Sequence, residues 1–191
     1  MNISDIQKRA QGVKAGTVSS LEVDYARGIL RAQRGNISSA LYVVGLCGTA
    51  DDALLIEPYL HGPERDVYGE TALKALVRYL GLVNRYRPLL RKLIMSATDL
   101  GFRNSRMSAI HLAKDYFKKF RDDELGCELV AIFCNPSDQD QPSARYTLVD
   151  ILGIRDEIGD PFGLKLEAGD ADAGYIVKMA RQRFNCPGGL H

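Results

Sequence analysis

Apolar residues recur every three or four positions along most of the chain, which is the spacing of one face of an α-helix. The clearest example is the series Tyr86, Leu89, Leu90 and Leu93. Runs of alternating β-branched residues that close on an Asn-Gly or Asp-Gly turn are absent. Segments rich in glycine, proline and aspartate separate helical stretches of roughly 10 to 18 residues. The pattern predicts an all-α fold in which short connections make sequential helices antiparallel.

The first strong helical signal lies near the amino terminus. Leu21, Tyr25 and Ile29 are spaced four apart, which predicts one apolar helix face. Ser19 and Glu22 have the spacing of a capping box at the start of that helix. We expect residues 1–35 to form capping helices, whose outer face should be polar as in the terminal units of repeat proteins.

Small residues repeat along the chain at an almost constant spacing. Alanines stand at 40, 72, 109 and 144, and each would let a neighbouring helix approach closely. Pro58 and Pro88 recur early in the apolar pattern that follows, where a first helical turn tolerates proline. The spacing favours a short α-solenoid, an α-α superhelix of about four stacked antiparallel helix pairs. The alternative is an irregular helical bundle whose alanines happen to be evenly spaced.

Two segments resemble a known repeat family. The segment 40–60 resembles a HEAT repeat, closest to the short bacterial kind found in bilin lyases. The segment 66–76 resembles the family's first helix, with Tyr68 where an arginine is common, and Arg106 and Arg145 are candidates for that arginine in later repeats. The resemblance covers roughly residues 36–153. It implies a shape and carries no chemistry, so a bilin-lyase function does not follow from it.

These signals together predict a single domain over residues 1–191. Residues 1–35 would cap one end, residues 36–153 would form the HEAT-like pairs, and residues 154–191 would form a loop followed by a C-terminal capping helix. The 25 Lys and Arg against 24 Asp and Glu leave a net charge of +1, which argues against a general nucleic-acid binder. The beginning of the chain lacks a secretory pattern, and its most apolar stretch is too short for a membrane span, so we expect a cytoplasmic protein with no membrane contact.

Few residues suggest chemistry. The four cysteines form no C-x-x-C pair, and Cys47, Cys127 and Cys134 fall in apolar helical patterns, which favours reduced thiols in the core. Of the histidines, His61 fits a helix end and His111 a partly buried structural position. Nucleophile signatures, phosphate-binding loops and metal-ligand spacings are absent. We therefore expect no catalytic activity, no metal and no cofactor.

Charged residues are grouped by helix rather than mixed, and two tyrosines lie near them in equivalent places. Tyrosine and arginine are enriched at the centres of protein interfaces. Acidic residues at helix starts also have a simpler explanation, since they complement the helix dipole. The candidate partner-binding residues are Tyr59, Arg85, Tyr86, Arg87, Arg91, Lys92, Asp123, Glu124 and Glu128.

Three functions fit this sequence. The first is a non-catalytic binding protein, most specifically a small bacterial inhibitor or immunity-type protein that neutralises another protein such as a toxin domain. The second is a nucleic-acid or DNA-repair-like HEAT module, although repair glycosylases of this kind use tryptophan and the chain has none. Its basic patch would comprise Arg85, Arg87, Arg91, Lys114, Lys118, Lys119 and Arg121. The third is an adapter or assembly chaperone within a larger complex.

Overall fold

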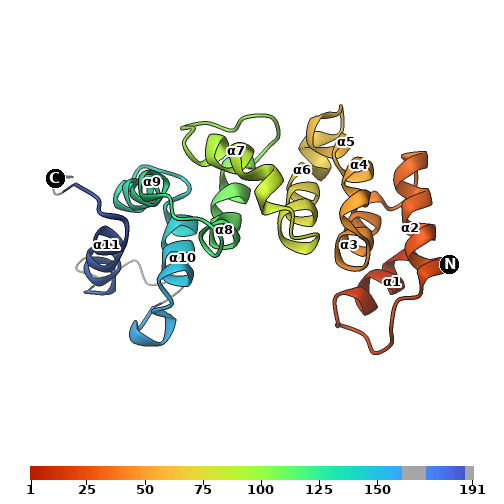
Figure 1. The fold of residues 1–191 in the computed structure, drawn as a ribbon, viewed down its shortest axis with the longest axis horizontal. Coiled ribbons are helices and arrows are strands. Elements are labelled where there is room, and N and C mark those ends of the chain that lie inside the picture. Colours follow the sequence, from red (N-terminus) through yellow and green to blue (C-terminus); the bar gives the residue numbers. More distant parts are fainter. Residues whose placement is uncertain (161–170, 188–191) are drawn as a thin grey trace. The chain divides into compact units, whose positions relative to one another are not determined.

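The computed structural model describes residues 1–160 and 171–187, and every regular element in these ranges is helical (Figure 1). The prediction of an all-α fold is confirmed, whereas the stacking of helix pairs into a solenoid stays a prediction. The helices are α1 (Ile3–Ala10), α2 (Ser20–Ala32), α3 (Ile37–Cys47), α4 (Ala53–Ile56), α5 (Pro58–His61), α6 (Arg65–Lys74), α7 (Val83–Ile94), α8 (Ser105–Phe117), α9 (Asp123–Cys134), α10 (Gln141–Leu152) and α11 (Ala171–Phe184). Shorter turns are η1 (Ala50–Asp52), the π-helical η2 (Ala75–Tyr79) and η3 (Arg155–Glu157).

The chain divides into two compact units. Unit 1 comprises residues 1–86 and 99–105, and unit 2 comprises residues 87–98 and 106–191. The division falls inside α7, next to Pro88. This proline lies in the helix interior instead of the first turn, where it cannot donate the backbone hydrogen bond that would continue the helix. Pro58, by contrast, is the first residue of α5, as the sequence predicts.

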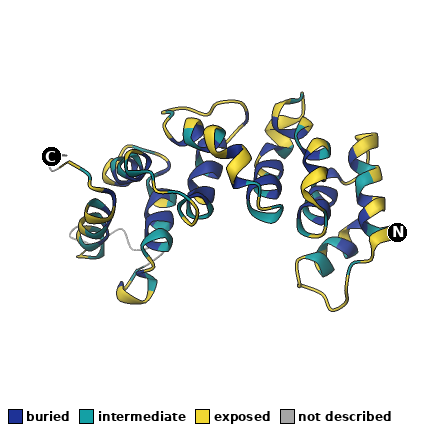
Figure 2. Cartoon of the chain, in the orientation of Figure 1, coloured by how far each residue is buried: buried dark blue, intermediate teal, exposed yellow. Residues whose placement is uncertain are grey.

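Unit 1 is built around α3. Helices α1 and α2 pack on α3, and α6 with η2 packs on it as well. Gly45 of α3 permits the last of these contacts, because a Cβ atom there would lie 2.9 Å from the Cβ of Ala75. The residues at this centre are fully buried, and Figure 2 colours the buried parts of α3 and α6 dark blue. They include Ala40, Leu41, Val43, Val44, Ala72, Leu73, Ala75 and Leu76.

Helix α2 begins as the sequence predicts and then turns a different face inward. The hydroxyl of Ser19 accepts a hydrogen bond from the backbone N–H of Glu22, whose carboxylate accepts one from the N–H of Ser19 in return. The buried residues of α2 are Val23, Ala26 and Leu30. Leu21 and Tyr25 are exposed and Ile29 is half-buried, so the predicted apolar series is not the packing face. The prediction that the outer face of this cap is polar is therefore wrong at Leu21 and Tyr25.

Unit 2 is built around α9, which packs on both α10 and α11. Gly126 of α9 is the point of closest approach, since a Cβ atom there would lie 2.2 Å from the ring of Phe184. Two arginines are buried in this unit. Arg106 donates to both carboxylate oxygens of Asp138 and to Asp140, and Arg145 donates to the backbone carbonyl of Asp160. Buried guanidinium groups need such partners because an unpaired charge is costly inside a protein.

The cysteines differ from the prediction of reduced core thiols. Cys127 on α9 and Cys186, just after α11, form a disulfide between positions 59 residues apart in the sequence. Cys47 and Cys134 are free and exposed, because each is the last residue of its helix, where it leaves the packed face. Pairing over such a distance has no local signal in the sequence.

The C-terminal segment agrees with its prediction where it is described. A last helix is present as α11, and residues 155–157 form the short turn η3. Most of the predicted loop, residues 161–170, lies outside the described residues. Among the helices of the described ranges, none combines the length and the apolar character needed to span a membrane.

Candidate functional site

Two adjoining hollows lie on the surface of unit 2. They have volumes of about 340 and 440 Å³ and share the side chains of Phe117, Lys118 and Arg183. We call the combined feature the α8 groove, since most of its lining comes from the carboxyl-terminal half of α8 and the turn that follows. Its lining residues are Lys114, Phe117, Lys118, Lys119, Phe120, Arg121, Asp123, Asp150, Ile151, Arg183 and Phe184.

Helical spacing explains why cations gather here. Lys114, Phe117 and Lys118 are at offsets 0, 3 and 4, which places them on one face of α8. Backbone hydrogen bonds from Lys118 to Lys114 and from Phe120 to Tyr116 carry this geometry past the end of the helix. The groove therefore has an aromatic floor from the same segment that supplies its basic rim.

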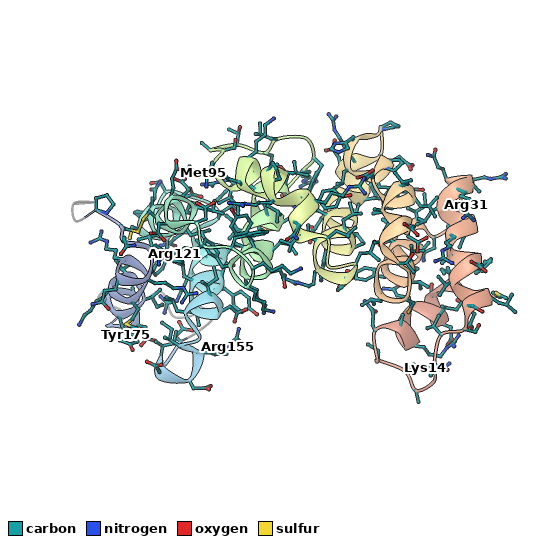
Figure 3. The ribbon with its side chains drawn as sticks, viewed as in Figure 1. Lys14, Arg31, Met95, Arg121, Arg155 and Tyr175 are labelled. Carbon is teal, nitrogen blue, oxygen red and sulfur yellow. A yellow bond between two sulfur atoms is a disulfide. The ribbon has the colours of Figure 1, made fainter. Side chains whose placement is uncertain are left out.

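The charge of the α8 groove is positive, because five lysines and arginines line it against two aspartates. Lys118 keeps 68% of its side chain exposed, and its contact with Asp115 is long, at 3.8 Å. Arg121, labelled in Figure 3, is 73% exposed and pairs with Asp123 at 3.0 Å. Such exposed pairs contribute little to stability, so these cations can be redirected to a ligand at small cost.

Lys114 is held more firmly than the rim cations. Its ammonium group lies 2.9 Å from Asp150, which also accepts a hydrogen bond from Arg155. Burial alone would raise the pKa of Asp150, but the hydrogen bonds from Lys114 and Arg155 outweigh it, so the pKa lies below its usual value. Asp150 is therefore ionised at neutral pH and fixes Lys114 at one end of the groove.

The opposite wall of the groove is fixed by the end of α11. Phe184 is only 2% exposed, and its ring lies 5.0 Å from that of Phe117, centroid to centroid. Asn185 donates from Nδ2 to Asp123 at 2.7 Å, and Cys186 is joined to Cys127. Three successive residues thus anchor this wall to the start of α9.

The arginines predicted from α7 have partners inside their own units. In unit 1, Arg85 pairs with Glu57 at 2.7 Å. In unit 2, Arg91 donates to Asp122 and also pairs with Glu124, while Arg87 donates to the hydroxyl of Tyr116 at 3.1 Å.

Asp122 is the centre of the contacts in unit 2. It caps α9 by accepting from the backbone N–H of Leu125, and it accepts from the Tyr116 hydroxyl as well. Burial would raise the pKa of Asp122, but the hydrogen bonds from Arg91 and Tyr116 lower it overall. Arg85 and Arg91 therefore neutralise acidic residues of their own units, whereas Arg87 bonds to a tyrosine hydroxyl.

The two predicted tyrosines are buried. Tyr59 donates its hydroxyl to the backbone carbonyl of Leu30 at 3.0 Å, and Tyr86 donates to Glu57 at 2.6 Å. Burial and the bond to Glu57 raise the pKa of Tyr86. Neither side chain presents a surface to a partner, because each has been used to join two helices.

The remaining predicted residues are dispersed. Lys92 and Glu124 are exposed, whereas Asp123 lies at the edge of the α8 groove. Glu128 is half-buried, and its pKa is raised because burial disfavours its charged form more than nearby Arg106 favours it. Of the nine predicted residues, only Asp123 lines the groove.

The basic patch of the second sequence hypothesis is divided in the same way. Lys114, Lys118, Lys119 and Arg121 line the groove, whereas Arg85, Arg87 and Arg91 do not. Sequence reasoning missed Arg183 and Phe184, since they lie more than 60 residues beyond α8. The only local signal was the basic and aromatic spacing of residues 114–121.

The structure offers no candidate for a metal centre in residues 1–160 and 171–187, where no group of three His, Cys, Asp or Glu side chains has a suitable arrangement. His61 is exposed at the end of α5, as its sequence position predicts. His111 is exposed rather than partly buried and makes an edge contact with Tyr146.

Comparisons with protein-family models, with curated proteins and with solved structures find no match to this chain.

Proposed function

We propose that this protein is a non-catalytic binding protein that holds an acidic segment of another protein in the α8 groove. The observation that carries the proposal is the exposed basic rim over an aromatic floor in unit 2. Carboxylates of a partner would pair with Lys118 and Arg183, and its apolar side chains would cover the edges of Phe117 and Phe120. The most specific function proposed from the sequence is a small inhibitor of a toxin domain, and such an inhibitor would bind its target through this groove.

The aromatic rings favour a protein partner over a nucleic acid. Proteins that bind single strands stack bases on open ring faces. Here the guanidinium of Arg87 lies 4.5 Å from the ring centre of Phe120, and Phe117 packs against the buried Phe184. Asp150 and Asp123 also lie in the lining, where they pair with Lys114 and Arg121. A groove with both signs of charge suits a protein segment that is acidic but not uniformly so.

A direct binding measurement tests the proposal. A fluorescent peptide of alternating glutamate and leucine is titrated with the full chain at low and at physiological salt, and anisotropy is followed. We expect saturable binding that weakens with salt. The double variant Lys118→Glu with Arg183→Glu should weaken binding at least about tenfold, because two attractive contacts become repulsive.

The matched control carries the same change of charge outside the groove, at Arg85→Glu with Lys92→Glu. It should bind the peptide within about twofold of the unchanged protein. Absence of saturable binding, or equal weakening in both double variants, would refute the groove as the site. Stronger binding to a single-stranded oligonucleotide of equal charge than to the peptide would replace the proposal with the nucleic-acid function.

A further inference from the structure

The outer face of α2 has the composition of an interface rather than of a solvent-exposed cap. Leu21 is 69% exposed and Tyr25 is 37% exposed, one helical turn apart. Gly28 follows on the same face, and a Cβ atom built there would meet no atom within 4 Å. A terminal helix that faces only water is expected to be polar here.

Two opposite charges flank this apolar face. Asp24 and Arg31 are both exposed and stand seven residues apart, which is two helical turns and the same side of the helix. Figure 3 labels Arg31 at the carboxyl-terminal end of α2. Asp24 accepts from Arg27 through one oxygen, Oδ1. The five residues Leu21, Asp24, Tyr25, Gly28 and Arg31 form what we call the α2 face.

We infer that the α2 face docks a second copy of this chain, with the two α2 helices antiparallel about a two-fold axis near residue 27. In such a pair a residue lies opposite the residue equally far beyond the axis and can also reach the positions next to it, because adjacent positions are only about 1.5 Å apart along a helix. Asp24 then faces the second copy's Arg31, and the Tyr25 ring enters the open space over the second copy's Gly28. Each contact occurs twice, which is the pattern of an isologous interface.

Charge complementarity identifies the occupant. The α2 face carries its own opposite charge at the matching distance, so a second copy satisfies Asp24 and Arg31 together. A different protein would need a separate acid and base at the same spacing. The contact is a single helix face, well below the size of a standard interface, so we expect a weak dimer with a Kd on the order of 10–100 µM.

A charge exchange tests the antiparallel geometry. Sedimentation equilibrium on the full chain should show a concentration-dependent dimer at low salt. Asp24→Arg places like charges opposite each other and should weaken dimerisation at least about fivefold. Adding Arg31→Asp restores opposite charges, and the double variant should recover dimerisation to within about twofold of the unchanged chain.

Two further variants separate this inference from folding and from the proposed function. Tyr25→Glu should give a monomer with unchanged helical circular dichroism. Lys118→Glu with Arg183→Glu, which removes the rim of the α8 groove, should dimerise as the unchanged chain does. The inference is overturned if the chain is monomeric at all concentrations, if dimerisation is insensitive to Tyr25→Glu, or if the charge exchange does not restore it.

Discussion

The two units use the same packing device and differ in how they secure it. In unit 1, the ring of Phe102 occupies the space over Gly69 of α6, and in unit 2 the ring of Phe184 occupies the space over Gly126 of α9. Phe102 lies in the loop before α8, which is tied to α6 by a hydrogen bond from the Arg103 N–H to Asp66. Phe184 lies beside a disulfide.

This difference favours unit 2 over unit 1 as the location of the proposed binding groove. A binding groove needs walls that keep their position when the ligand arrives, because ordering them on binding costs affinity. The end of α11 is anchored by Phe184, by the bond from Asn185 and by Cys186. Unit 1 contains a single cysteine, Cys47, and it is free.

The largest expected effect comes from the buried charges. Arg106→Met leaves Asp138 and Asp140 without their cation and should destabilise unit 2 by about 3–5 kcal/mol. In unit 1 the corresponding change is Arg27→Met, which removes the cation that pairs with buried Asp52. Asp52 keeps its bond from the Thr49 N–H, so we expect a smaller loss of about 1–3 kcal/mol. Hydrogen exchange followed by mass spectrometry measures both, and equal losses would contradict the comparison.

Reduction of the disulfide should act on one unit only. Opening the loop between Cys127 and Cys186 should cost unit 2 about 4 kcal/mol by the chain-entropy model. Segment-resolved hydrogen exchange with and without a dithiol reductant should show faster exchange in α9 and α11, and unchanged exchange in α2 and α3. Cys186→Ser should reproduce the reduced state without reductant. Uniform acceleration in both units would show that the disulfide does not act locally.

The paired glycines allow a direct comparison of the two packing sites. Gly126→Ala should destabilise unit 2 by about 2–3 kcal/mol, because the anchored Phe184 ring cannot move away from the added methyl group. Gly69→Ala should cost unit 1 only about 1 kcal/mol, because the loop of Phe102 is tied by a hydrogen bond from the Arg103 N–H and not by a disulfide. Gly174→Ala is the control, since its Cβ meets nothing and should stabilise α11 by up to about 1 kcal/mol. Urea denaturation of the three variants ranks them, and a larger loss at Gly69 would reverse the conclusion.

The smallest effect is a pH dependence with opposite signs at two acids. The raised pKa of Glu128 means that its charged form opposes folding above that pKa, and this cost disappears as the pH falls. Glu128→Gln should therefore stabilise unit 2 by about 0.5 kcal/mol at pH 7 and lose that advantage below about pH 4.

Asp138 behaves in the opposite way. The hydrogen bonds from Arg106 lower its pKa, so its contribution is complete above the usual aspartate range and is lost as the pH falls through the lowered pKa. Chemical denaturation between pH 3 and pH 7 distinguishes the two acids. A Glu128→Gln variant less stable than the unchanged protein at pH 7 would show that the carboxylate has a favourable partner.

Local signals in the sequence were sufficient for the helices and their caps. The spacing of Ser19 and Glu22 predicted the capping box of α2, and Gly153 ends α10 in the left-handed conformation that glycine favours. Periodicity shows which residues share a face but not which face is buried. Leu21 and Tyr25 form a true apolar face of α2, and only the neighbouring helices decide that Val23 and Leu30 pack instead.

The site was harder to predict because its parts are distant in sequence. The grouping of charges indicated Arg91 as a binding residue. Its acidic partner Asp122 lies 31 residues away, so the sequence alone could not show that the charge of Arg91 is neutralised. The basic and aromatic spacing of residues 114–121 did indicate a cationic surface. The contribution of Arg183 and Phe184 depends on α11 folding back against α9, which the disulfide fixes and the spacing of cysteines does not reveal.

The central claim is that the proposed acidic segment of a partner binds to unit 2 in the α8 groove and does not bind to unit 1. The most direct measurement is a backbone amide NMR titration of the full chain with the glutamate–leucine peptide. The account predicts that the shifts concentrate in residues 114–121 and 183–186, while the amides of α3 and α6 stay unchanged. Shifts centred on unit 1, or on the α7 residues 85–92 without any change at 114–121, would contradict it.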